Sequence, residues 1–232
     1  MTEETSRAAK LEAETRKLHA EAEAAELDAA LKRVELIEAD LKRQQTEREE
    51  AEYLASDTMN GAYYFNDGVS TASVAKLRRT LTQWSRLHPG RDVRIVINSG
   101  GGSVFDGLDL MDCLNDIKAT GSYVTTVIAG MAASMAGVLA QMGDTRIIGR
   151  HSRLHLHEVS TGSIGKASDI KDTADLAESL TRQTCAVYAD RAVFSAATET
   201  MTADEIFDWI ERQERWLSAD EAVSRGFADQ VG

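Results

Sequence analysis

The chain has 232 residues and a formal net charge of −12, with 43% hydrophobic and 28% charged residues. This length suffices for one sizeable domain plus an appendage. The acidic balance argues against a nucleic-acid binder, which needs a basic face to meet phosphates. The chain has neither an apolar signal core at its N-terminus nor an apolar run of membrane-spanning length, so we expect a cytoplasmic protein with no membrane partner.

Residues 1–55 differ in composition from the rest of the chain. They lack Gly, Pro, Phe and Trp and are mostly Ala, Glu, Leu, Lys and Arg, which favour helix. Leu11 and Leu18 are seven residues apart, and Leu27, Val34 and Leu41 repeat the spacing in another phase. The pattern predicts a long helix, either a coiled coil with an interrupted heptad or a solvated helix without a partner. We expect two domains, a helical or coiled-coil arm over residues 1–55 and a folded domain over residues 56–232.

The remainder of the chain alternates between strand-like and helix-like patterns. The expected strands are residues 62–65, 93–97, 123–129, 146–148 and 153–158, and the expected helices are residues 74–87, 103–118, 131–142 and 167–192. Two capping boxes, Thr202 with Glu205 and Ser218 with Glu221, begin two final helices. Repeated strand–helix units predict an α/β fold with a largely parallel sheet. The β-branched strand at residues 93–97 is expected to be buried on both faces, and Cys113 and Cys185 to be buried small residues in helices, without a disulfide framework.

Ser134 lies in a run of small residues, Gly130-Met-Ala-Ala-Ser-Met-Ala136, just after an expected strand. A serine hydroxyl is a poor nucleophile unless a base takes its proton and donors hold the developing oxyanion. The first turn of a helix has free N–H groups that favour negative charge. Ser134 is therefore a candidate nucleophile; its alternative role is that of a small residue in a tightly packed helix.

A triple glycine, Gly100-Gly101-Gly102, follows the strand at residues 93–97 and precedes a helix. Ligands bind at the carboxyl ends of strands in α/β sheets, and glycine allows backbone N–H groups to point at them. The loop is either an oxyanion-binding loop or a plain strand-to-helix turn.

His155 and His157 alternate with two leucines on an expected strand. A period of two places both histidines on one face, so either could be a general base or a surface residue. No acidic or cysteine cluster is near them in the sequence, and we expect no metal.

These pieces, in this order, closely resemble the proteolytic subunit of the Clp protease, ClpP, over roughly residues 60–232. The resemblance rests on Ile97–Gly102, on the run around Ser134, on residues 152–157, and on residues 215–226. It implies a ClpP/crotonase-like α/β fold whose helix at residues 167–192 is the handle that joins two rings. The nucleophile and C-terminal motifs favour a protease over a crotonase-type acyl-CoA enzyme.

By position, the resemblance makes Ser134 the nucleophile and His157 the base of a serine endopeptidase. The N–H groups of Gly101 and Met135 would form the oxyanion hole, and His155 would be a neighbour in the site wall. Glu214 stands where the family usually has the Asp of its triad. Because its longer side chain changes the reach, Asp208 remains the alternative acid.

The resemblance further implies stacked homo-oligomeric rings that cleave protein or peptide substrates inside a chamber, without a cofactor. The acidic arm stands where the family has a gating segment. The partner of this chain would be an ATPase unfoldase, or a phage scaffold or capsid protein. The alternative function is a non-catalytic ring or assembly protein that uses the arm for binding.

Overall fold

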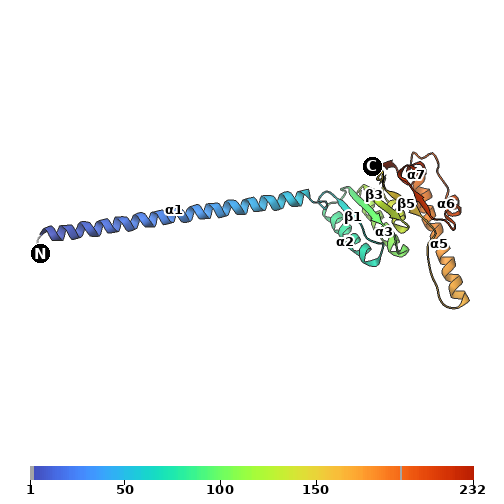
Figure 1. Ribbon diagram of the computed structural model, residues 1–232, viewed down its shortest axis with the longest axis horizontal. Helices are drawn as coiled ribbons and strands as arrows, with labels where there is room; N and C mark the ends of the chain where they lie inside the picture. Colours follow the sequence, from blue (N-terminus) through green and yellow to red (C-terminus); the bar gives the residue numbers. More distant parts are fainter. Residues whose placement is uncertain (1–2, 194) are drawn as a thin grey trace. The chain divides into compact units, whose positions relative to one another are not determined.

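The computed structural model describes residues 3–193 and 195–232 and divides the chain into two units at residue 56 (Figure 1). The first unit is one helix, α1 (Glu3–Ala55). All of its described side chains are exposed, and ion pairs such as Arg16–Glu12, 2.8 Å apart, connect successive turns. Such pairs each contribute only a few tenths of a kcal/mol. The expected helical arm is confirmed, and among the described residues no helix is long and apolar enough to cross a membrane.

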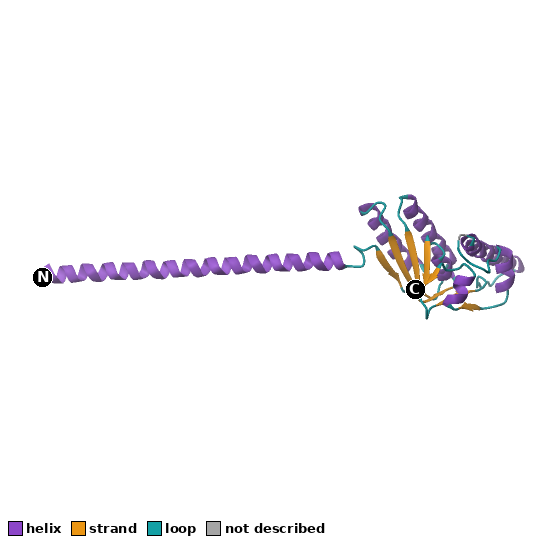
Figure 2. Cartoon of the chain, turned by 90° about the horizontal axis from the view of Figure 1, so that it is seen from above, coloured by secondary structure: helices purple, strands orange, loops and turns teal. Residues whose placement is uncertain are grey.

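The second unit contains a seven-stranded sheet with helices (Figure 2). Its strands are β1 (Ala62–Phe65), β2 (Val93–Ser99), β3 (Val124–Ala133), β4 (Thr145–Ile148), β5 (Arg153–Leu156), β6 (Arg215–Leu217) and β7 (Gln230–Val231). The main order is β1-β2-β3-β4-β7, and β5 pairs with both β3 and β6. All pairs are parallel except β5 with β6. The predicted α/β class with a largely parallel sheet is confirmed.

The described residues of this unit form six helices. They are α2 (Thr71–Leu87), α3 (Val104–Ala119), α4 (Met135–Ala140), α5 (Ala167–Ala192), α6 (Ala203–Ile210) and α7 (Ala219–Ser224). The expected long handle-like helix is α5, with the predicted bounds. Both predicted capping boxes are formed, at the starts of α6 and α7.

The core lies between one face of the sheet and the helices that cover it. Phe65, Ile95 and Ile97 meet Leu77 of α2 and Leu110 of α3 there. Cys113 and Cys185 are both buried and free, as expected.

The expectation that residues 93–97 are buried on both faces is wrong. Along β2, Arg94 and Asn98 are exposed while their neighbours in the chain are buried or half-buried. Among the described residues, one face of the strand is covered and the other is largely exposed, as in a sheet with one solvated side.

A second correction concerns residues 131–133, which the sequence pattern predicts to be helical. They continue β3, because Met131, Ala132 and Ala133 pair with β5. The strand bends at Gly130, whose φ is +90°. Two side chains satisfy the amides at the bend: Gly130 donates to Ser152 Oγ at 2.9 Å, and Met131 donates to Asn98 Oδ1 at 3.2 Å. The helix is thereby delayed until Met135, and Ser134 occupies the junction.

A buried arginine ties the C-terminal segment to the sheet. Arg146 of β4 is 2% exposed and donates to both oxygens of Asp229, to Gln141 Oε1 and to the Gly226 carbonyl. A buried guanidinium is tolerated only when its donors are satisfied. This network holds the ends of α4, α7 and β7 together.

We expect Asp229→Ala to lower the free energy of unfolding by about 3 kcal/mol, because it leaves the Arg146 charge buried and unpaired. The matched control is Asp109→Ala, which breaks the exposed pair with Arg78 and should cost at most about 1 kcal/mol. Urea unfolding of both variants measures the difference. Equal midpoints would contradict a structural role for the buried pair.

We expect a chain lacking residues 1–55 to keep the fold of residues 57–232. The deletion removes no described side chain that is buried, so the second unit loses no hydrophobic stabilisation. Circular dichroism and sedimentation of the full-length and truncated chains test this expectation. An unfolded truncated chain would show that the arm is structural.

Candidate functional site

Ser134 is presented at the point where β3 ends and α4 begins. Its φ of 54° and ψ of −130° lie in a region that residues other than glycine rarely adopt. The turn is held from both sides: the Ser134 N–H donates to the His155 carbonyl at 3.1 Å, and its own carbonyl accepts from Gly137 at 2.9 Å. Strained residues of this kind cluster at functional sites.

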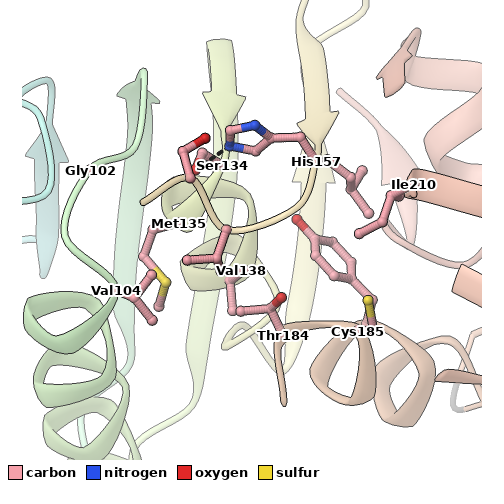
Figure 3. Close-up of a pocket in the computed structure, with 13 residues that line it drawn as sticks. Gly102, Val104, Ser134, Met135, Val138, His157, Thr184, Cys185 and Ile210 are labelled. Carbon is pink, nitrogen blue, oxygen red and sulfur yellow. Dashed lines mark hydrogen bonds between the residues drawn. The ribbon is translucent and has the colours of Figure 1, made fainter. Parts of the chain in front are cut away.

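The two histidines lie on the same side of their strand, as the alternation predicted, with ring centroids 4.9 Å apart. His155 is within β5, whereas His157 follows it, because the strand ends at Leu156, earlier than expected. The Nε2 atom of His157 lies 2.8 Å from the Ser134 hydroxyl (Figure 3). The structure therefore brings Ser134 and His157 into hydrogen-bond contact.

Glu214 immediately precedes β6, and its side chain extends to both histidines. Its Oε2 lies 2.5 Å from His155 Nε2, while its Oε1 lies 3.6 Å from His157 Nδ1. The second distance is too long for a hydrogen bond, so the carboxylate is bonded to His155 and only near His157. The alternative acid, Asp208, is exposed on α6, and no contact with either histidine is found among the described residues.

His155 contacts Trp216 as well as Glu214. Its ring stacks on Trp216 with centroids 4.2 Å apart. Burial lowers the pKa of His155, and the nearby His157 lowers it further, against the raising effect of the Glu214 hydrogen bond. The stacking on Trp216 and the contact with Glu214 fix the orientation of the His155 ring. The Trp216 and Glu214 contacts depend on the antiparallel pairing of β5 with β6, which the spacing of the histidines alone does not indicate.

The glycine loop packs directly against the turn that carries Ser134. Gly101 has a φ of +86°, and a side chain there would collide with the Ala133 carbonyl and the Ser134 Cβ, so this position requires glycine. The Gly101 N–H, however, donates to Ser99 Oγ at 3.2 Å. Gly102, the next residue, is exposed and lines a pocket with Ser134 and Met135.

This pocket, with a volume of about 210 Å³, opens beside Ser134 and His157 (Figure 3). Its walls are mainly apolar, formed by Val104, Met135, Val138, Leu156, Val159, Cys185, Tyr188 and Ile210. Burial raises the pKa of the Cys185 thiol to about 11, so the thiol stays protonated and is a poor nucleophile beside Ser134. The contributions of α5 and α6 to the pocket were not predicted from the sequence, since helical periodicity identifies a buried face but not the pocket it borders.

His155, His157 and Glu214 are also the residues of this site that could hold a metal ion. One donor atom of each lies within 4.8 Å of the others.

Comparison with known proteins identifies the family of the chain. The family model described as Clp protease matches residues 58–232. The ATP-dependent Clp protease proteolytic subunit of Bacteroides fragilis is 36% identical over 157 residues, covering 67% of this chain and 70% of that protein. The subunit of Bacteroides thetaiotaomicron is 33% identical, covering 75% of this chain and 74% of its own length. Subunit 1 of Chlamydia caviae is 31% identical, covering 72% and 84%. The chain therefore belongs to the Clp protease family.

Proposed function

We propose that this chain is a serine endopeptidase that cleaves peptide bonds through an acyl-enzyme. The observation that carries the proposal is the 2.8 Å contact between Ser134 Oγ and His157 Nε2. A positioned imidazole within this distance can take the hydroxyl proton as the oxygen attacks a carbonyl. Family membership supports the same chemistry.

In this mechanism Ser134 Oγ attacks the scissile carbonyl carbon while His157 Nε2 accepts the proton. The tetrahedral oxyanion is stabilised by backbone N–H groups, and His157 then protonates the leaving amine. Water, activated by the same imidazole, hydrolyses the ester formed on Ser134. The strained backbone of Ser134 aims the hydroxyl at the substrate before binding, which reduces the reorganisation needed.

The proposed oxyanion donors are the N–H groups of Met135 and Gly101. Met135 is the first residue of α4, and no residue of that helix precedes it to accept its N–H. The Gly101 N–H already donates to Ser99 Oγ, which makes the N–H of Gly102, a residue that lines the pocket, a second candidate. Either glycine amide would share the oxyanion with Met135.

Glu214 is proposed as the third member of the triad. At 3.6 Å from Nδ1 of His157 it stabilises the imidazolium by charge rather than by a direct hydrogen bond. Asp208 has no comparable position.

The pocket beside Ser134 supports a preference for substrates with an apolar side chain at the cleaved position. Burying such a side chain contributes about 25 cal/mol for each Å² of apolar surface removed from water. The relatives are named as subunits of an ATP-dependent protease, and we propose that this chain likewise assembles into homo-oligomeric rings around a chamber. The α1 arm is proposed to recruit a partner, either an ATPase unfoldase or a phage scaffold or capsid protein.

Ser134→Ala should abolish labelling by a fluorophosphonate probe and lower peptide cleavage by at least about 10³-fold, since it removes only the attacking hydroxyl. Adding His157→Ala to this variant should cause little further loss, because the two residues act as a unit. Labelling and cleavage are measured on full-length protein, with sedimentation to confirm assembly. Undiminished labelling of Ser134→Ala would exclude Ser134 as the nucleophile, whereas a wild-type chain that neither reacts with the probe nor cleaves peptide would favour the non-catalytic alternative.

Glu214→Gln should lower kcat by at least about tenfold, but by less than the about 10⁴-fold that follows loss of a hydrogen-bonded triad aspartate. The reason is the long distance between the carboxylate and His157 Nδ1. Asp208→Asn is the matched control, and its steady-state kinetics should equal those of the wild type. If the two phenotypes are reversed, Asp208 is the third member.

A further inference from the structure

Two imidazoles and a carboxylate converge at this site in a way that a serine triad alone does not require. His155 Nε2 and Glu214 Oε2 are 2.5 Å apart, and His157 Nδ1 lies 3.6 Å from the other carboxylate oxygen. The donor atoms lie within 4.8 Å of one another. Residues 59 positions apart in the chain meet here because β5 pairs with β6.

We propose that His155, His157 and Glu214 form a reversible binding site for a divalent transition-metal ion of the zinc class. Zinc takes imidazole nitrogen and carboxylate oxygen together, and sites with three protein ligands leave a fourth position for water. Two imidazoles disfavour magnesium and calcium, which select oxygen ligands. The site is a regulatory addition to the serine chemistry and supplies no step of it.

The surroundings meet two further requirements of a metal site. His155 is fixed by its stacking on Trp216, so one ligand is oriented before the ion arrives. Entry is open from solvent, because the Glu214 side chain is 65% exposed. The depression beside the site is also lined by Glu158 and Glu211, whose negative charges attract cations. The positive charges of Arg182 and Arg212 in the same lining offset this attraction.

Occupation of this site would switch the proposed protease off, a consequence that rests on the proposed function. A metal bound to Nδ1 of His157 uses the lone pair of that nitrogen, so in the neutral ring the proton resides on Nε2. Nε2 is then a donor and cannot accept the Ser134 proton. The same ion also withdraws the Glu214 carboxylate from its role beside the imidazolium.

The binding test uses full-length Ser134→Ala protein freed of metal by chelator dialysis, so that the result does not depend on activity. Calorimetric titration with Zn²⁺ should show one site per chain, Ni²⁺ should compete, and Mg²⁺ should not bind. Adding His155→Phe, which keeps an aromatic ring for Trp216, or Glu214→Gln should weaken Zn²⁺ binding by at least about tenfold. His151→Asn, which removes an exposed histidine, should leave it unchanged.

The inhibition test uses the active chain. Zn²⁺ should stop peptide cleavage, EDTA should restore it, and His155→Phe should need at least about tenfold more Zn²⁺ for half-inhibition. Absence of Zn²⁺ binding, or equal binding in all variants, would overturn the proposed site; because Glu214 is exposed, Glu214→Gln decides the question if His155→Phe fails to fold. Binding without inhibition would overturn the switch. Zn²⁺ binding by a chain that never cleaves peptide would support the site and refute the proposed function instead.

Discussion

The pairing of the second half of β3 with β5 is the constraint on which the site depends. It extends β3 beyond Gly130, delays α4, and leaves Ser134 at the junction with a positive φ. The same pairing places His155 opposite Ala133, so the strand that ends before His157 runs beside the serine turn. Ser134 and His157 are 23 positions apart in sequence, and one short parallel ladder sets their distance. Polar side chains at the bend satisfy the amides that the sheet would otherwise leave unpaired.

Much of the fold could be predicted because its signals are local. The bounds of α5 and the capping boxes of α6 and α7 follow from side chains within a few residues of each other. The prediction failed where tertiary pairing overrides local preference: Met131, Ala132 and Ala133 suit a helix, yet β5 recruits them into a strand. It also failed for β2, because an apolar run does not reveal whether both faces will be covered.

The site divides in the same way. The candidate residues Ser134 and His157 were found from the local pattern and the resemblance, and the structure brings them together. The partners of His155 could not be predicted from neighbouring residues, because Glu214 and Trp216 lie about 60 positions later in the chain, in and just before β6. The Glu214 side chain is long enough to place one carboxylate oxygen beside each of two histidines. His155 is the second histidine, next to His157. His155 and Glu214 are therefore one structural feature, since each bonds the other.

The Arg146–Asp229 network has a consequence for the kinetics of folding. Arg146 and Asp229 are 83 positions apart. The loop between them closes late, because the chain loses conformational entropy on closure before the stabilising contacts form. Ser134 and His157 belong to a shorter segment that can form first. Glu214 and the α6 wall of the pocket lie in the segment between α5 and Asp229. A newly folding chain would thus form the contact between Ser134 and His157 before its complete pocket, and Glu214 would join that contact only when the C-terminal segment has docked.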